Sequence, residues 1–146
     1  MNETTAPAPP ERMTQHWTFA MLHAAQAIGD SLETALGRVG LSMAKQSALT
    51  QLAQAGEPLT LSELAARLSC VRSNITQLVD RLEADGLVKR IDDASDRRSV
   101  RAALTALGRK KQVAGAEEVA RVQAEITRRL SAAERRALEI ALGSLT

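Results

Sequence analysis

The sequence predicts a mainly α-helical fold with one small β-hairpin, and three observations support this prediction. Apolar residues recur at helical spacing along most of the 146-residue chain. Residues 87–104 instead have the pattern of two short strands around a polar turn. Helix-capping residues, glycines and prolines separate the segments at short intervals. A chain of this length can bury a core without disulfides or a structural metal, so we expect an ordinary folded domain.

The N-terminal part of the chain predicts a disordered tail, residues 1–12, followed by a long helix, residues 13–38. The tail is rich in proline and almost free of bulky apolar residues. One helical stripe then repeats at steps of four and three residues: Trp17, Met21, Ala24, Ile28, Leu32, Ala35 and Val39. Gly37 and Gly40 end this helix. Ser42 is the expected N-cap of a second helix, which stops at Gly56-Glu57-Pro58.

Two shorter helices are predicted in the middle of the chain. Thr60 and Glu63 have the spacing of a capping box. The helix that they begin is expected to bury Leu61, Leu64, Ala65 and Leu68. A tight turn over residues 69–72 leads to Ser73, the expected N-cap of a helix over residues 73–84.

A hairpin and two more helices complete the prediction. Residues 87–91 and 99–104 have the pattern of strands, and residues 92–96 that of the polar loop between them. Thr105 is the expected cap of a helix over residues 106–129. Ser131 and Glu134 form a second capping box. The final helix is expected to bury Leu138, Ala141, Leu142 and Leu145.

Two short helices joined by a tight turn and followed by a hairpin make a winged helix-turn-helix lobe, here residues 41–104. Helix 73–84 is expected to face the core with Ile75, Leu78, Val79 and Leu82. It then turns outward Ser73, Gln77, Asp80, Arg81 and Ala84, with Asn74 and Thr76 at the flanks. Glutamine and asparagine can pair with adenine, arginine with guanine, and serine or threonine with phosphate. The pattern predicts a helix that reads DNA, and an ordinary solvated helix face is the alternative.

The tip of the hairpin carries two adjacent cations in the sequence Asp96-Arg97-Arg98. An arginine at the tip of a projecting ribbon can enter the narrow, electronegative minor groove of DNA. Asp96 is close enough in sequence to orient one of the guanidinium groups through an ion pair. The alternative interpretation is a charged turn that is only solvated.

Positive charge is concentrated in the middle third of the chain. Residues 60–111 carry 11 basic and 7 acidic side chains, whereas residues 1–59 have a net charge of −2 and residues 112–146 a net charge of zero. A local basic excess is typical of a surface that binds nucleic acid, although many solvated faces also have one.

The sequence indicates a cytoplasmic protein that does not contact a membrane. No apolar run approaches the roughly 20 residues that span a bilayer. The N-terminus lacks the basic and apolar stretches of a signal peptide. Cys70 is the only cysteine, which excludes a disulfide within one chain and agrees with a reducing compartment.

Residues 61–108, LSELAARLSCVRSNITQLVDRLEADGLVKRIDDASDRRSVRAALTALG, resemble the MarR family of bacterial transcription regulators. The resemblance rests on the phrase LVDRLEADGLVKR, the wing pattern DxxDRR, the LT..G that follows and the long helices on either side. It implies that helix 73–84 reads the major groove and that Arg98 enters the minor groove, with Asp96 holding it. The family usually has proline where this chain has Ala94, which implies a looser wing.

Residues and resemblance together predict one set of DNA-contacting residues. The set is Arg72, Ser73, Asn74, Thr76, Gln77, Arg81, Arg97 and Arg98, supported by Asp96. The recognition helix 73–84 supplies most of its members and the wing, residues 92–98, supplies the rest.

The resemblance also implies a homodimer in which the N-terminal and C-terminal helices of two subunits interlock. Residues 13–40 and 105–146 would form this dimerisation region, and each lobe would read one half of a near-palindromic site. The residues agree, because the stripes on the long helices present more apolar surface than one small lobe can cover. The alternative is that these stripes pack within one subunit.

Many relatives lose DNA affinity when a small anionic or phenolic molecule binds between the dimer helices and the lobe. The residues here that can line such a crevice are His16, Trp17, Met21, Arg38 and Met43. The chain has one Trp, one Phe and no Tyr, so few aromatic side chains are available to stack on an effector. Trp17 also suits the core of a dimer. His16 and His23 lie on one helical face, but two histidines do not complete a metal site, which would need carboxylates as further ligands. We therefore expect no metal and no other cofactor.

Cys70 lies in the turn between the two short helices, close in sequence to Arg67 and Arg72, whose charge favours a reactive thiolate. Oxidation at this turn would disturb DNA binding, so a regulator switched by oxidation of Cys70 is one alternative function. A small, half-buried turn residue without redox chemistry is the other interpretation.

Two further classes of function compete with DNA reading. An enzyme is not expected, because the chain has no Gly-rich phosphate loop, no Ser/His/Asp constellation and no cluster of metal ligands. A winged lobe can also bind another protein and not DNA, but the polar outward face and Arg97-Arg98 argue against this. The sequence therefore predicts a dimeric transcription regulator, by default a repressor.

Overall fold

A computed structural model of the protein describes residues 11–69, 72–96 and 98–145. The chain divides into two compact units, Met1–Ser31 and Leu32–Thr146. The described part of the first unit is one stretch of helix, the beginning of α1 (Glu11–Gly37). Its large apolar side chains are exposed, and Trp17 keeps 66% of its surface. Because α1 begins at Glu11, the predicted tail is wrong at residues 11 and 12, and the rest of that tail lies outside the described residues.

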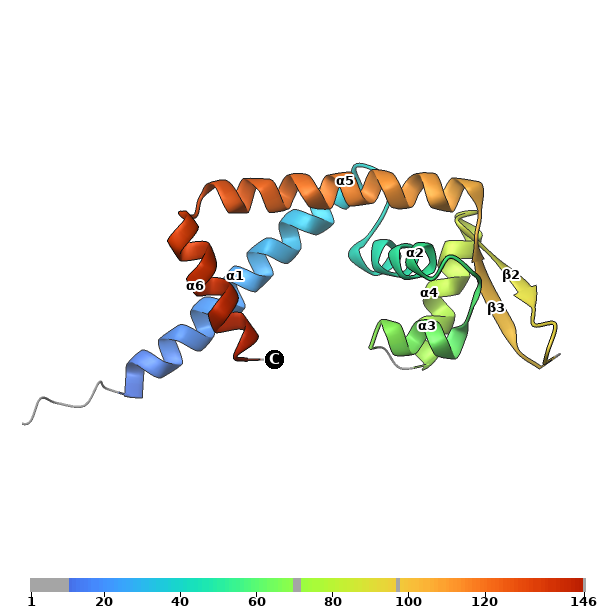
Figure 1. Cartoon of the computed structure of the whole chain (residues 1–146), viewed down its shortest axis with the longest axis horizontal. Coiled ribbons are helices and arrows are strands. Elements are labelled where there is room, and N and C mark those ends of the chain that lie inside the picture. Colours follow the sequence, from blue (N-terminus) through green and yellow to red (C-terminus); the bar gives the residue numbers. More distant parts are fainter. Residues whose placement is uncertain (1–10, 70–71, 97, 146) are drawn as a thin grey trace, which may run out of the picture. The chain divides into compact units, whose positions relative to one another are not determined.

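The second unit holds the end of α1 and all the other elements (Figure 1). In chain order these are α2 (Met43–Ala55), β1 (Leu59–Thr60), α3 (Leu61–Arg67), α4 (Arg72–Ala84), β2 (Val88–Asp92), β3 (Val100–Leu104), α5 (Ala106–Arg128) and α6 (Ala132–Gly143). Helix α2 packs against α5, and the β2–β3 hairpin projects from the N-terminal end of α5. None of the helices within the described ranges is long and apolar enough to cross a membrane.

The helix caps that the sequence predicts for α2, α3, α5 and α6 are confirmed. The Ser42 side chain accepts a hydrogen bond from the backbone N–H of Lys45, and Gly56 ends α2 with a left-handed φ of 69°. Thr60 and Glu63 form the expected capping box at the start of α3. The same motif begins α6, and Thr105 caps α5.

The start of α4 differs from the prediction. The helix begins at Arg72, so Ser73 lies within its first turn and is not its N-cap. Ser69, where the predicted turn begins, adopts a left-handed φ of 51° just after α3. The remaining turn residues, Cys70 and Val71, lie outside the described residues.

The strands form a three-stranded antiparallel sheet in the order β1-β3-β2. The predicted hairpin is confirmed, with Arg90 opposite Ala102 and Ile91 opposite Arg101. The sequence did not predict the pairing of Leu59 with Ala102, which adds β1 to the free edge of β3. A strand of two residues carries no periodicity, so only the distant partner strand defines it.

One hydrophobic core holds the lobe together and fixes α4 on it. Its largest fully buried side chains come from the end of α1, from α2, α3 and α4, and from β2: Leu36, Leu49, Leu64, Ile75, Val79, Leu82 and Val88. Every residue of α4 in this set was predicted to face the core. Leu78, also predicted to face the core, is only partly buried and packs against its rim.

Helix α5 approaches the lobe closely at two glycines. A Cβ on Gly108 would lie 1.9 Å from the carbonyl oxygen of Leu87, in the chain just before β2. A Cβ on Gly115 would lie 2.1 Å from Oε1 of Gln46 on α2. Gln46 is buried, and its Nε2 donates a hydrogen bond of 3.0 Å to the carbonyl of Gln112 on α5. The two glycines therefore allow α5 to lie directly on the backbone and side chains of the lobe.

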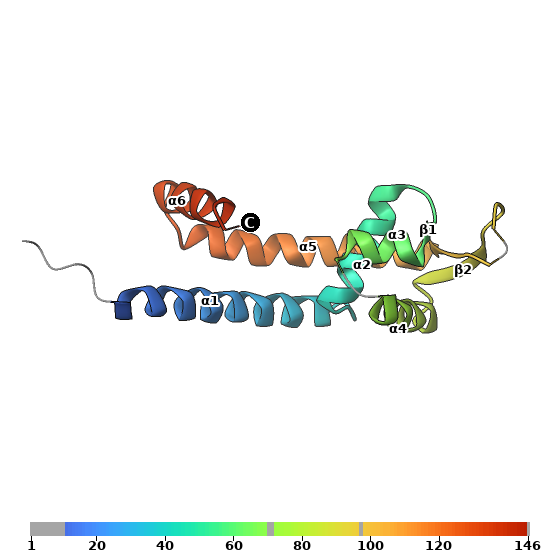
Figure 2. The same cartoon turned by 90° about the horizontal axis from the view of Figure 1, so that it is seen from below.

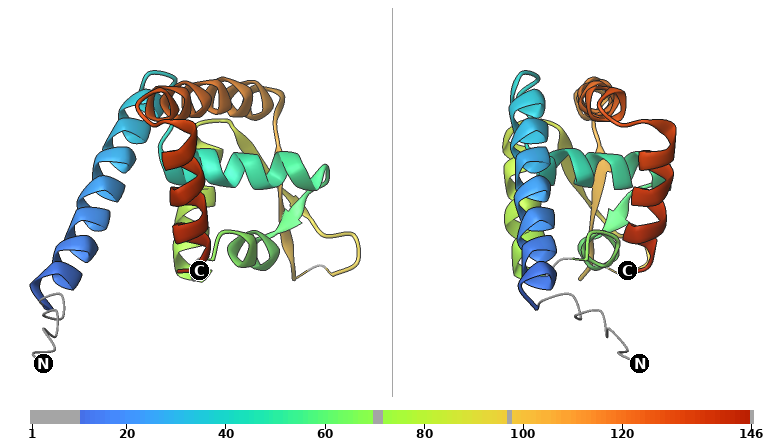
Figure 3. Two further views of the ribbon diagram at one scale, coloured as in Figure 1. Left: turned by 60° about the vertical axis from the view of Figure 1, so that its left-hand side comes forward. Right: turned by 90° about the vertical axis from the view of Figure 1, so that its left-hand side faces the viewer.

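The prediction that α6 buries its apolar stripe is wrong for the single chain. No side chain of α6 is buried, and Leu138, Ile140 and Leu145 near the C-terminus keep 47%, 66% and 65% of their surface. Figure 3 shows that α6 turns sharply at the end of α5, and in Figure 1 this end of α5 lies away from the lobe. An amphipathic helix in that place has no apolar surface of its own unit to cover it.

Candidate nucleic-acid interface

Helix α4 turns one polar face away from the core. Ile75, Val79 and Leu82 are fully buried, whereas the intervening residues Asn74, Thr76, Gln77, Asp80, Arg81 and Ala84 are exposed. In the view of Figure 2 the helix lies at the edge of the lobe, next to the start of β2. The predicted division of this helix into a core face and an outward face is confirmed for these residues. We call Asn74, Thr76, Gln77 and Arg81, together with Arg98 of the wing, the reading surface.

Four predicted residues cannot be placed as side chains. Arg72 and Ser73 belong to the first turn of α4, where backbone N–H groups lack helical partners, but their side chains lie outside the described residues. Cys70 and Arg97 lie outside the described residues altogether. Their contacts with DNA, and the redox chemistry of Cys70, stay predictions.

Arg90 joins the wing to α4, and sequence reasoning missed this role. From β2 its guanidinium donates hydrogen bonds to the carboxylates of Asp80 and Glu83, which lie one helical turn apart on α4. The hydrogen bond to Asp80 holds the pKa of Arg90 above its ordinary value, against the smaller effect of burial. The strand that contains Arg90 was predicted, but the sequence did not indicate that the fold brings Arg90 to Asp80 and Glu83. Both carboxylates on the outward side of α4 are thus paired with a cation.

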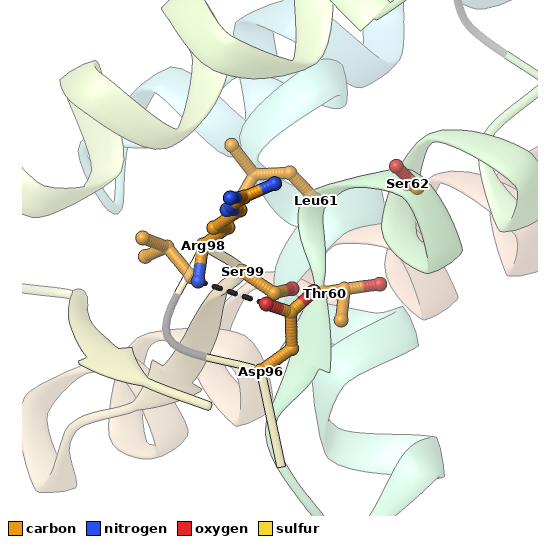
Figure 4. A pocket seen from close by; sticks show the side chains of 7 residues that line it. Thr60, Leu61, Ser62, Asp96, Arg98 and Ser99 are labelled. Carbon is orange, nitrogen blue, oxygen red and sulfur yellow. Dashed lines mark hydrogen bonds between the residues drawn. The ribbon is translucent and has the colours of Figure 1, made fainter. Parts of the chain in front are cut away.

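Asp96 supports the wing in a different way from the one predicted. One oxygen of its carboxylate accepts a hydrogen bond of 2.9 Å from the backbone N–H of Arg98 (Figure 4). Its backbone carbonyl accepts another, also 2.9 Å, from the N–H of Ser99. Between these two described residues the structure contains no ion pair of Asp96 with the Arg98 guanidinium, whereas a pairing of Asp96 with Arg97 lies outside the described residues and stays a prediction. The carboxylate instead closes the turn, as aspartate does in many tight turns, because its short side chain reaches the backbone two residues on.

A pocket of about 320 Å³ separates the wing from the beginning of α3. Its lining consists of Thr60, Leu61, Ser62, Asp96, Arg98, Ser99 and Val100. Figure 4 shows the Arg98 side chain extending from the wing toward the Leu61 side of this pocket. Three hydroxyl groups, one guanidinium and the carboxylate of Asp96 line it, which is a polar environment that suits water.

The five residues of the predicted effector crevice lie in both units. His16, Trp17 and Met21 belong to the first unit, and Arg38 and Met43 to the second, so a common crevice stays a prediction. Arg38 has a partner of its own, since its Nη1 lies 3.8 Å from Oε2 of Glu118. Glu118 is a buried carboxylate on α5 that also accepts a hydrogen bond of 2.8 Å from Arg121. Within the described residues, no three His, Cys, Asp or Glu side chains gather as metal ligands would.

Comparison with known sequences finds one family. Residues 41–100 match the MarR family, and this range runs from just before α2 to the first residue of β3. The HTH-type transcriptional regulator PrsX of Escherichia coli is 35% identical over 88 residues, which are 60% of this chain and 53% of the relative. The chain therefore spans about half the length of the curated relatives that it matches.

Solved structures extend the similarity to nearly the whole chain. Sco3205, a MarR family transcriptional regulator from Streptomyces coelicolor in complex with DNA, has a TM-score of 0.81 and 27% identity, covering 96% of this chain and 89% of its own. The transcriptional repressor CouR, bound to a 23-mer DNA duplex, has the same TM-score and identity and covers 96% of this chain and 99% of its own. The similarity includes the helices on both sides of the lobe.

Proposed function

We propose that the chain is a transcription regulator of the MarR family, whose model matches residues 41–100, and that it binds double-stranded DNA through the reading surface. The observation that carries the proposal is the polar face of α4, whose Asn74, Gln77 and Arg81 are exposed on a helix that is otherwise fixed in the core. A rigid helix with short polar side chains suits the major groove, where it can approach base edges closely. The DNA-bound forms of Sco3205 and CouR support the choice of DNA as the partner.

The residues of the lobe divide into readers and phosphate contacts. Gln77 and Asn74 suit adenine, and Arg81 suits guanine, because each can form two hydrogen bonds with one base. Arg72, Ser73 and Thr76 suit phosphates around the start of α4. Arg97 and Arg98 place positive charge on the wing, where a narrow minor groove attracts it, and Asp96 shapes the turn that presents them.

A homodimer is the second part of the proposal. The exposed apolar side chains of α6, and those of α1 in residues 16–31, need a cover that neither unit supplies by itself. A second copy of the chain supplies matching stripes, and two-fold symmetry then sets the two lobes on two half-sites of a near-palindrome. Residues 13–40 and 105–146 form the dimerisation region in this proposal.

We further infer a cytoplasmic repressor without catalytic activity, released from DNA by a small anionic or aromatic effector. His16, Trp17, Met21, Arg38 and Met43 remain the candidates for binding it. Redox control is the weaker option, so mild peroxide should leave DNA affinity unchanged. A large loss of affinity that Cys70→Ser abolishes would replace the effector by a redox switch.

The proposal is tested by selection from a random pool of duplexes with the purified full-length chain. We expect one enriched sequence with two related halves about one helical turn apart. Affinity for it should fall steeply with salt, with a log–log slope of roughly −0.9 for each phosphate neutralised. A pool that yields no enriched sequence, with weak binding to all duplexes, would favour the winged lobe as a protein-interaction module.

A further inference from the structure

Arg101 lies on β3 at the base of the wing and connects three separate segments of the lobe. Its Nε donates a hydrogen bond of 2.9 Å to Oδ2 of Asp93, at the start of the wing loop. Its Nη1 donates to the carbonyl of Pro58, at 3.1 Å, and to Oε2 of Glu63 on α3, at 3.5 Å. The side chain is 29% exposed, and these hydrogen bonds of the guanidinium are all made to groups of the lobe itself.

The two carboxylates that receive Arg101 are fixed by other hydrogen bonds. Oδ1 of Asp93 accepts from the backbone N–H of Ser95, at 3.0 Å, and from its hydroxyl, at 2.8 Å. Oε2 of Glu63 accepts from the backbone N–H of Thr60, at 2.8 Å. An unbroken series of hydrogen bonds therefore runs from Ser95 in the wing loop through Arg101 to the first residue before α3. The same contacts, led by the N–H groups of Ser95 and Thr60, lower the pKa of both carboxyl groups.

This series of hydrogen bonds borders the pocket that contains Arg98. Glu63 follows Ser62, and Arg101 follows Val100, which are two of the lining residues on opposite sides of the pocket. The distance between α3 and the wing loop is thus set next to the place where Arg98 leaves the wing (Figure 4). Asp96, which closes the Arg98 turn, lies three residues after Asp93 in the same loop.

We propose that Arg101 is a positioning residue for DNA binding. It holds the wing loop on α3, so that the wing loop is already ordered before the wing arginines contact DNA. The proposal rests on the proposed function, because it concerns how the same surface is presented. A loop that is already ordered loses little conformational entropy when it binds, so affinity rises without any new contact. This matters in a wing that has Ala94 in place of a conformationally restricted proline.

The alternative role for Arg101 is a direct contact with a phosphate. Its geometry disfavours that role, because the guanidinium is mostly buried and two carboxylates already neutralise its charge. The two roles predict opposite effects for Asp93. Removal of a negative charge near DNA should strengthen binding if Arg101 is a phosphate contact, but should weaken it if Arg101 acts by holding the loop.

The test is a double-mutant cycle on the full-length chain with the duplex enriched from the random pool. Arg101→Gln and Asp93→Asn are each measured in the wild-type chain and in a chain that carries Arg97→Ala and Arg98→Ala. In the wild-type chain we expect each substitution to weaken binding by about tenfold. In the chain without wing arginines we expect a change of less than about twofold, because the loop then has nothing to position. Arg101→Lys, which keeps the charge but not the fork of donors, should give an intermediate loss.

Two controls separate this effect from general damage. Arg109→Gln removes an exposed arginine from the first turns of α5 and should leave affinity within about twofold. Denaturant unfolding of every variant shows whether the lobe still folds, and Asp93→Asn keeps the shape of the side chain if Arg101→Gln unfolds it. Equal losses in both backgrounds, or tighter binding by Asp93→Asn, would overturn the proposal. If the wild-type chain enriches no duplex, the proposed function has failed, and this outcome is distinct from the other two.

Discussion

The lobe buries its apolar side chains, whereas the C-terminal helix α6 leaves its apolar side chains exposed. In the lobe, side chains such as Leu49, Leu64 and Ile75 are fully buried by neighbouring elements of the same chain. In α6 the equivalent stripe is exposed along its whole length, although the helix has a well-formed capping box. Local signals therefore define both regions equally well, but only the lobe completes its own packing.

This difference separates what one chain can do alone from what needs a second surface. A folded lobe with a buried core can present α4 and the wing in fixed positions, which is what base recognition requires. An amphipathic helix without a cover gains little from its apolar side chains until it meets another apolar surface. We therefore expect substitutions in the lobe to change folding at any concentration, and substitutions in α6 to change assembly.

The largest contrast should come from leucine truncations in the two regions. Leu64→Ala removes a fully buried side chain of α3 and should lower the free energy of unfolding by about 2–5 kcal/mol. Leu138→Ala removes an exposed side chain of α6 and should shift the monomer–dimer equilibrium toward monomer, which sedimentation at several concentrations would measure. If Leu138→Ala left assembly unchanged and the chain stayed dimeric, the role of α6 in the dimer would be wrong.

Glycine-to-alanine substitutions where α5 meets the lobe and in α6 should show the same contrast, with a smaller change in the free energy of unfolding. Gly108→Ala places a Cβ 1.9 Å from the backbone carbonyl oxygen of Leu87, which cannot move without displacing β2, the strand that follows it. We expect a loss of about 1–3 kcal/mol in the free energy of unfolding, measured by urea denaturation. Gly143→Ala in α6 is the matched control, because no atom lies within 4 Å of its added Cβ. A Gly108→Ala chain as stable as the control would mean that α5 does not lie against the lobe as described.

Acid should weaken the lobe through its paired carboxylates. Hydrogen bonds from Ser95 and Thr60 keep the pKa values of Asp93 and Glu63 below those of the unfolded chain. A lowered folded pKa contributes stability above the unfolded value near 4, and this contribution is lost as the pH falls through the folded value. The urea midpoint should therefore drop below about pH 4, and it should drop less steeply in Asp93→Asn, which has no carboxyl group to protonate there. An equal drop in wild type and variant would contradict the role given to Asp93.

The smallest effect should come from the caps. Ser131→Ala removes the side chain that accepts a hydrogen bond from the N–H of Glu134, and should cost α6 about 0.5–1 kcal/mol. Because α6 is exposed in the single chain, this loss should appear as reduced helix content by circular dichroism at low protein concentration, with the urea midpoint of the lobe unchanged. Thr60→Ala in α3 should instead lower that midpoint, since its helix is part of the core. Identical effects of the two substitutions on the midpoint would show that α6 folds as part of the lobe.

The sequence was sufficient to predict the features that depend on near neighbours in the chain. Capping boxes at Thr60 and Ser131, the hairpin strands and the outward face of α4 each follow from residues a few positions apart. The start of α4 was missed by one residue, and no local sequence pattern indicated the left-handed conformation of Ser69, which is uncommon for serine.

Features that depend on distant residues could not be predicted in the same way. The pairing of β1 with β3, the contacts of Arg90 with α4 and those of Arg101 with Pro58 and Glu63 all join segments that the fold alone brings together. Asp96 had two possible partners within reach in the sequence, the backbone and a guanidinium. In the folded turn its carboxylate accepts a hydrogen bond from the backbone N–H of Arg98.

The central claim is that the lobe reads DNA with α4 and the wing, and fluorescence anisotropy on the enriched duplex tests it most directly. Gln77→Ala, Arg98→Ala and the control Arg109→Gln are compared with the wild-type chain at several salt concentrations. We expect a loss of about tenfold or more for Gln77→Ala and for Arg98→Ala, and a shallower salt slope for Arg98→Ala. The control should bind with wild-type affinity. Wild-type affinity for all three variants would contradict the assignment of the reading surface.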